Sequence, residues 1–233
     1  MIKKILAVAA MATFSVTATA QHAHSDIEVV VESGQLEIEN GILLTSGAKL
    51  FEAEFGELIN PYEADEPGFE ADDGQFMSGE ILGFEALGTL QFWNGLSWGS
   101  SATGTMTLTD TLPSTLDTVV DGLGVTNGIG FIGQADIDGG VHDHFDFEVG
   151  DTGGTPANGA YLLELRVRGF SDTTFTTDVY TASDSFFIAF NLGMEEADFE
   201  MAVDALGIAV PIPAAWLLML SGLAPLYLAR RRK

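Results

Sequence analysis

The sequence GAYLLELRVRGF, residues 159–170, decides the fold class of this chain. Apolar residues at positions 163, 165 and 167 alternate with charged residues at positions 164, 166 and 168. In an extended strand, successive side chains point to opposite faces, so this alternation puts one face in a core and the other in water. The stretch therefore predicts a β-strand with one buried face.

Shorter strand-like runs lie on both sides of this stretch, and segments rich in glycine and other turn residues separate them. We expect further strands at residues 26–32, 49–55, 80–87, 89–93, 103–108 and 185–191. Residues 194–206 have apolar side chains at helical spacing instead, which predicts one short helix at the end of the domain. About eight short strands indicate a mainly β fold, an antiparallel β-sandwich or jelly-roll-like single domain.

The first twenty residues have the pattern of a secretory signal peptide. Lysines at positions 3 and 4 give a positive start, and residues 5–12 are apolar. Ala18-Thr19-Ala20 fits the rule for the cleavage site, in which small residues flank any one residue. Cleavage after Ala20 would leave Gln21 as the first residue of the exported protein.

The C-terminal end has the pattern of a membrane anchor. Residues 208–229 carry no charge, and four basic residues at 230–233 follow directly. Twenty-two helical residues span roughly 33 Å, enough to cross a bilayer core, and the basic end should stay in the cytoplasm. We therefore expect a signal peptide at 1–20, an acidic domain at 21–207 and a tail with one transmembrane helix at 208–233. The precursor should be anchored in the inner membrane with its domain outside the cytoplasm.

The tail also resembles a known sorting signal. Val210-Pro211-Ile212-Pro213-Ala214 precedes the apolar run and the arginine-rich end. This order is similar to the VPxPA variant of the PEP-CTERM domain, in which a short proline motif, a transmembrane helix and a basic end follow one another. The resemblance implies processing near the proline motif by an exosortase, a membrane protease-transpeptidase of Gram-negative bacteria. It also implies delivery to the cell surface or the extracellular matrix.

The domain between these ends is strongly acidic. All 34 acidic residues lie between Asp26 and Asp204, and the basic residues there are Lys49, Arg166 and Arg168, which gives a formal charge of −31. Nucleic acid is excluded as a partner, because binding to phosphates needs lysine and arginine. Such a field attracts cations. The chain has no cysteine, so disulfides and thiolate zinc sites are excluded as well.

The histidines occur in two copies of one pattern, His-x-His-x-Asp, which together contain every histidine of the chain. The copies are His22, His24 and Asp26 near the N-terminus, and His142, His144 and Asp146 within the domain. In a strand, residues i, i+2 and i+4 share a face, so each copy should present two imidazoles and a carboxylate together. This ligand set suits Zn²⁺, and also Cu²⁺ or Ni²⁺. We predict that the two copies form a metal site, with zinc closed by four histidines or by three with an aspartate.

Clustered carboxylates leave calcium open as an alternative metal, since Ca²⁺ prefers oxygen ligands. The acidic stretch at 63–74 does not match the spacing of an EF-hand, and it is typical of a solvated loop. The sequence Asp136-Ile137-Asp138-Gly139-Gly140 is typical of a turn that leads into the strand with His142.

The domain resembles the Zur-repressed PEP-CTERM proteins. The shared features are the His22-x-His24-x-Asp26 start, the segments 67–76, 82–84 and 92–95, the His142-x-His144 pair, and the segments 159–165 and 183–191. Zur represses genes when zinc is plentiful. The resemblance therefore implies expression during zinc starvation and a role in zinc capture outside the cytoplasm.

Zinc binding for capture or storage is thus the leading functional hypothesis. A structural matrix or adhesion module with acidic calcium-binding loops is the alternative. We do not expect an enzyme, because the chain has no cysteine nucleophile. Copper oxidases that use a terminal amine need histidine as the first residue, and the expected cleavage leaves Gln21 there.

Overall fold

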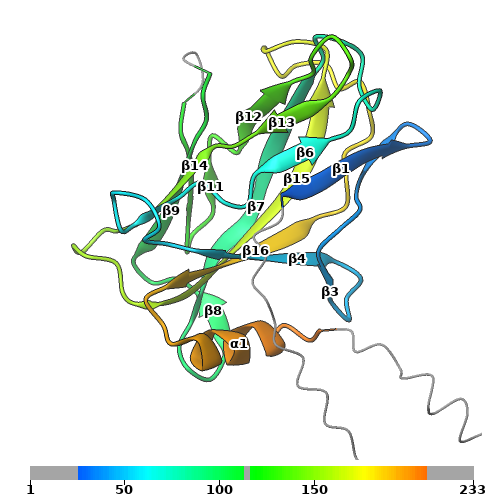
Figure 1. The fold of residues 1–233 in the computed structure, drawn as a ribbon. Helices are drawn as coiled ribbons and strands as arrows, with labels where there is room; N and C mark the ends of the chain where they lie inside the picture. Colours follow the sequence, from blue (N-terminus) through cyan, green and yellow to red (C-terminus); the bar gives the residue numbers. More distant parts are fainter. Residues whose placement is uncertain (1–25, 113–115, 209–233) are drawn as a thin grey trace, which may run out of the picture.

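The stretch at 159–170 forms the central strand of the largest sheet in the computed structural model, which describes residues 26–112 and 116–208 (Figure 1). This strand, β15 (Gly159–Phe170), pairs antiparallel with β7 (Ile81–Trp93) on one side and with β16 (Phe186–Leu192) on the other. Its alternating apolar side chains at 163, 165 and 167 are fully buried, so the predicted strand with one buried face is confirmed.

Seven strands make up this sheet, in the order β12-β7-β15-β16-β4-β3, with β8 paired to β7. Its other strands are β3 (Ile42–Leu43), β4 (Lys49–Glu54), β8 (Trp98–Ser100) and β12 (Ile129–Gln134). The sequence predicts two strands where the single β7 stands. Gly88 adopts a positive φ of 64°, and the pairing with β15 shifts register between Leu162 and Glu164, so a bulge joins the two predicted strands into one.

Two smaller sheets complete the β structure. A four-stranded sheet has the order β13-β6-β1-β2, with β1 (Ile27–Glu32), β2 (Gln35–Ile38), β6 (Phe69–Ala71) and β13 (Val141–Asp143). A five-stranded sheet has the order β11-β10-β9-β14-β5, with β5 (Glu63–Ala64), β9 (Gly104–Thr109), β10 (Thr118–Asp121), β11 (Val125–Thr126) and β14 (Asp146–Asp151).

The mainly β composition is confirmed, but purely antiparallel pairing is wrong. β1 pairs parallel with β6, and β16 pairs parallel with β4, whereas the other strand pairs are antiparallel. Parallel neighbours need a long connection between them. Both parallel pairs join strands that are distant in the sequence, and such pairing leaves no trace in local alternation.

The predicted short helix is confirmed as α1 (Glu196–Asp204). Phe199, Ala202 and Val203 are its buried residues, and they pack in a cluster with Leu50 and Leu162 of the seven-stranded sheet. Among residues 26–112 and 116–208, no helix has the length and apolar character needed to cross a membrane. Apart from Ile208, the expected transmembrane tail lies outside these residues.

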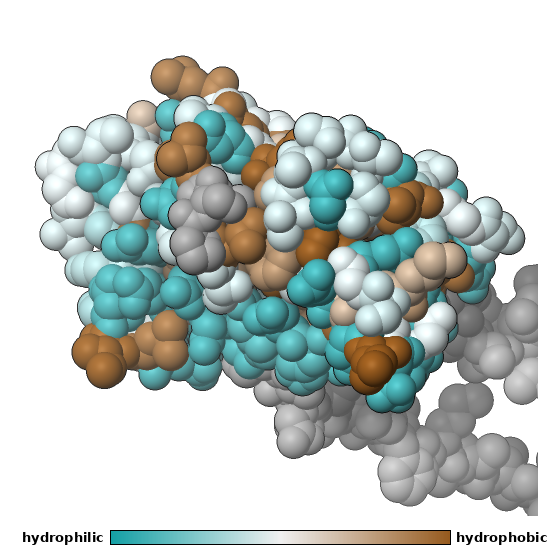
Figure 2. Space-filling model, turned by 90° about the horizontal axis from the view of Figure 1, so that it is seen from above, coloured by the Kyte–Doolittle hydropathy of each residue, from teal (hydrophilic) through white to brown (hydrophobic). Residues whose placement is uncertain are grey.

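The main core draws buried side chains from all three sheets. Phenylalanines connect them: Phe147 of β14 contacts Phe190 of β16, and Phe69 of β6 contacts Phe186. The face seen from above in Figure 2 is dominated by polar residues, with hydrophobic residues at separate positions. This core fixes the four-stranded sheet, whose end carries the candidate site.

Candidate metal centre

Three predicted ligands meet at one end of the four-stranded sheet. The short strand β6 lies between β1 and β13, and its first residue, Phe69, pairs with Ile27 on one side and Asp143 on the other. Asp26 directly precedes Ile27, and His144 directly follows Asp143. The register of β6 therefore brings Asp26 and His144 to the same edge.

The ligand atoms of Asp26, His142 and His144 all lie within 4.8 Å of one another. Nε2 of His142 is 3.4 Å from Nε2 of His144 and 3.5 Å from Oδ2 of Asp26. Oδ1 of Asp26 is 3.9 Å from Nε2 of His144. Two ligands at the usual zinc distances and a tetrahedral angle lie roughly 3.3 Å apart. The two imidazole nitrogens are close to this spacing, and each of them lies near a different oxygen of the Asp26 carboxylate.

A backbone carbonyl orients His144. Its Nδ1 lies 2.9 Å from the carbonyl oxygen of Asp65. A carbonyl oxygen can only accept, so Nδ1 carries the proton in the neutral ring and Nε2 keeps a free lone pair. That lone pair is on the side of His142 and Asp26. Histidine ligands of metals usually have such a partner on the second nitrogen.

Hydrogen bonds also fix the carboxylate and the backbone carbonyl of Asp26. The Gly68 N–H donates to Oδ1 of Asp26 at 3.1 Å, and Nδ2 of Asn40 donates to the Asp26 carbonyl at 2.7 Å. Oδ1 of Asn40 in turn accepts from the Glu28 N–H at 3.0 Å. The Asp26 side chain is only 16% exposed, so its carboxylate has a fixed place.

Gly68 permits the His144 ring to lie where it does. A Cβ built on Gly68 would stand 2.4 Å from Cε1 and 2.6 Å from both ring nitrogens. No real Cβ tolerates such distances, so any other residue at 68 would displace the imidazole. Gly68 and Asp65 were not among the predicted site residues, because the stretch at 63–74 is typical of a solvated loop. The structure differs, since β5 and β6 lie in this segment and Asp65 and Gly68 connect them.

The surroundings of His144 are negative. Burial lowers its pKa, but the hydrogen bond to the Asp65 carbonyl and the charges of Asp26 and Glu66 outweigh burial, so the pKa is raised above its usual value. Oε1 of Glu66 lies 3.9 Å from Nδ1. The same charges that hold a proton on His144 would hold a divalent cation.

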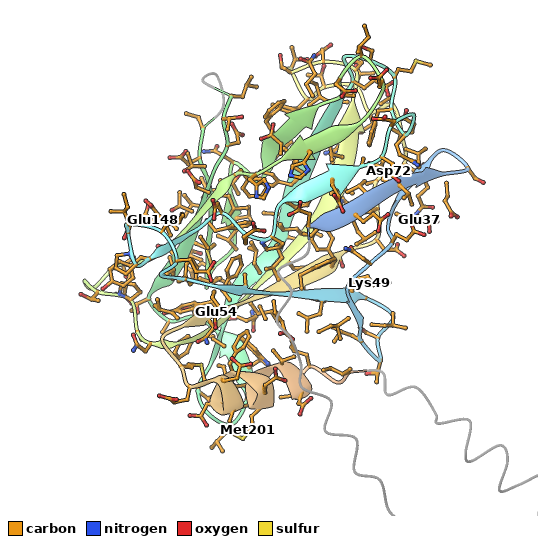
Figure 3. The ribbon with its side chains drawn as sticks, viewed as in Figure 1. Glu37, Lys49, Glu54, Asp72, Glu148 and Met201 are labelled. Carbon is orange, nitrogen blue, oxygen red and sulfur yellow. The ribbon has the colours of Figure 1, made fainter. Side chains whose placement is uncertain are left out.

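An acidic row extends from the site across the four-stranded sheet. His142 is the register partner of Glu70, Glu70 is the partner of Glu28, and the Glu39 N–H donates to the Glu28 carbonyl at 3.0 Å. The pKa of Glu28 is raised by lost hydration first, and then by the charges of Glu39, Asp72 and Glu70. Figure 3 shows Asp72 at the end of β6 and Glu37 on β2, on either side of β1.

Asp146 is not part of the three-residue group. The chain leaves β13 after Asp143, and β14 starts at Asp146 in a different sheet, with the buried Phe145 at the crossing. Residues 142–146 are therefore not one strand, and the rule that i, i+2 and i+4 share a face does not apply. The pKa of Asp146 is raised by burial and by Glu63 and Asp65. His22 and His24 lie outside the described residues.

The segment after residue 135 forms the predicted turn. Oδ1 of Asp136 accepts from the N–H groups of Asp138, Gly139 and Gly140, at 2.8, 2.9 and 3.1 Å. The Asp136 N–H closes the turn by donating to the Gly140 carbonyl. One oxygen of this carboxylate is thus committed to the backbone.

Comparison of the chain with models of protein families, with curated protein sequences and with solved structures finds no match.

Proposed function

We propose that this protein binds a divalent transition metal, zinc above all, outside the cytoplasm and serves to capture or store it when zinc is scarce. The convergence of Asp26, His142 and His144, whose ligand atoms lie within 4.8 Å of one another, carries the proposal. Two imidazoles with one carboxylate suit Zn²⁺ better than Ca²⁺, which prefers a shell of oxygen ligands. Cu²⁺ and Ni²⁺ accept the same ligands.

The N-terminal histidines are proposed to complete the site. His24 precedes Asp26 by two residues, which limits the distance between their Cα atoms to about 7 Å. His24 is therefore within reach of the face that Asp26, His142 and His144 leave open, and His22 follows along the same segment. A fourth protein ligand would give a closed site for holding the ion, whereas a water there would leave an open one.

The cellular setting of this proposal comes from the ends of the sequence. The signal peptide at 1–20 supports export, and the tail at 208–233 supports an inner-membrane precursor. The resemblance of the tail to a PEP-CTERM signal supports transfer by an exosortase-type enzyme to the cell surface or matrix. A core shared by three sheets supports a sandwich-like or jelly-roll-like scaffold. We propose a binding protein and no enzyme.

Elemental analysis and zinc titration of the exported protein, purified without a polyhistidine tag, test the proposal. We expect about one zinc per chain. The double variant His142→Ala/His144→Ala should lose tight binding, whereas Asp146→Asn, which removes a nearby carboxylate outside the group, should titrate like the wild type. Equal affinity of the wild type and the double variant would refute the site. Calcium in place of zinc would favour the matrix or adhesion alternative.

A further inference from the structure

The three candidate ligands differ in how firmly the protein holds them, and the inference drawn from this difference rests on the proposed metal binding. The Asp26 side chain is 16% exposed, and its Oδ1 accepts from the Gly68 N–H. The ring of His144 is 32% exposed, and its Nδ1 lies 2.9 Å from the Asp65 carbonyl oxygen. Both ligands therefore have a partner that keeps them in place without a metal.

His142 lacks this support. Its side chain is 65% exposed, and its Nε2 faces His144 and Asp26. Within residues 26–112 and 116–208, no hydrogen bond orients its Nδ1. It is the middle residue of β13, a three-residue strand that stands last in the order of its sheet. Exposed side chains change rotamer in picoseconds to nanoseconds, so this ring can turn away and return without moving a packed residue.

An open hollow of about 500 Å³ adjoins His142. Three carboxylates line it, those of Glu70, Asp72 and Asp73. Glu70 is the register partner of His142, so the two side chains lie on the same face of the sheet. Figure 3 shows Asp72 at the end of β6, on this side of β1. An incoming group has room to approach His142 here, and the carboxylates attract cationic groups and repel anionic ones.

The His144 half of the site offers no comparable approach. The ring lies against the Gly68 backbone, where a Cβ would stand 2.4 Å from Cε1. The Asp65 carbonyl holds its Nδ1, and the next residue, Phe145, is buried. Displacing His144 would break this hydrogen bond and move a ring that the backbone confines, whereas displacing His142 breaks only its bond to the metal.

We propose that the metal is transferred at His142 to a positively charged partner that offers an imidazole and docks at the hollow. The bond from the metal to Nε2 of His142 breaks while a bond to an imidazole nitrogen of the partner forms. Each nitrogen supplies its own electron pair, so the oxidation state of the metal is unchanged. Asp26 and His144 hold the ion during this exchange. Imidazole fits because it ligates zinc as a neutral group, whereas a thiolate or carboxylate would bring negative charge to an acidic surface.

Stopped-flow transfer of zinc from the full-length, zinc-loaded chain tests this proposal. Two acceptors are compared at low ionic strength: a synthetic peptide with two histidines flanked by lysines, and the anionic chelator EDTA. Glu70→Gln/Asp72→Asn removes two charges of the hollow, so the ratio of the peptide rate to the EDTA rate should fall by about tenfold or more. Both transfers start from the same loaded protein, so a change in zinc affinity cancels in this ratio.

Glu63→Gln/Glu148→Gln is the matched control. These two carboxylates are register partners on β5, which ends directly before Asp65, and on β14, which begins two residues after His144. The control removes the same charge on the His144 side of the site and should change the ratio by less than about twofold. Relaxation dispersion of the ring carbons in the zinc-loaded wild type should show exchange at His142 and none at His144.

Equal ratios in the two double variants would overturn transfer at the hollow. Exchange at His144 in place of His142 would overturn the role of His142. In either case, zinc still bound to the wild type leaves the proposed metal binding intact. A wild-type chain that takes up no zinc would refute both proposals.

Discussion

The imidazole of His144 fills the space that a side chain on Gly68 would need: a methyl group on residue 68 would stand 2.4 Å from Cε1 of the ring. The two residues are far apart in the sequence, and β6 brings them together where it pairs with β13. The position of the His144 imidazole thus depends on the absence of a side chain at residue 68, directly before β6.

Gly68→Ala should therefore weaken zinc binding although no ligand changes. The added methyl group displaces the His144 ring from the Asp65 carbonyl, and loss of such an orienting partner typically costs about 10–100-fold in metal affinity. Competition titration with a zinc chelator measures the change. Gly99→Ala is the control, because a Cβ there meets no atom within 4 Å and should leave the affinity unchanged. An unchanged affinity of Gly68→Ala would show that the imidazole position is not fixed by this contact.

The raised pKa of His144 predicts that two quantities change in opposite directions with pH: the stability of the metal-free protein and its affinity for zinc. A group whose pKa is higher in the folded state contributes stability below its unfolded pKa, here 6.5, and that stability is lost as the pH rises through the folded value. The free energy of unfolding of the metal-free protein should therefore fall in this window. Zinc affinity should rise there, because only a neutral imidazole ligates.

Urea unfolding of the metal-free protein and zinc titration, each repeated from pH 6.5 upward, measure the two changes. NMR titration of the His144 ring measures its pKa directly. Asp26→Asn removes one of the charges that raise the pKa of His144, so its titration should move toward lower pH. If His144 titrates at the same pH in the variant and in the wild type, Asp26 does not act on this ring.

Trp98 should anchor α1 to the seven-stranded sheet. Its Nε1–H donates to the Ala202 carbonyl at 2.8 Å, across 104 positions of sequence. Trp98→Phe removes this donor, and we expect a loss of about 0.5–1.5 kcal/mol in the free energy of unfolding. Met201→Ala, at a helix position that is 56% exposed and labelled in Figure 3, should change it by less than about 0.5 kcal/mol. Equal losses in denaturant titrations of the two variants would contradict a specific role for Trp98.

Local periodicity was enough to predict the strand at 159–170 and a helix within 194–206, which the structure has at 196–204, because each buries one face and shows this in its own residues. The parallel pairs could not be predicted, since β1 and β6 meet only through long-range packing. The sequence around Gly88 did not indicate that the predicted strands at 80–87 and 89–93 form one strand with a bulge between them.

The candidate site was predictable in its ligand types and only in part in its geometry. Histidine spacing singled out His142 and His144, and the structure brings Asp26 to them. The same spacing placed Asp146 beside them, and this fails because the chain changes sheets at Phe145. Gly68 and Asp65 carry no metal-binding signature of their own, since one acts by lacking a side chain and the other through its backbone.

The pairing of β6 with both β1 and β13 has a consequence for when the proposed metal site could be filled. His142 follows Asp26 by 116 positions, so a chain that has not yet folded must close a very large loop to bring these ligands together. The three-residue group can form only after this long-range pairing, and contacts between distant residues are slow to form. A chain threaded unfolded across a membrane would leave this site unformed until it arrived, and its ion would come from the compartment of destination, not from the cytoplasm.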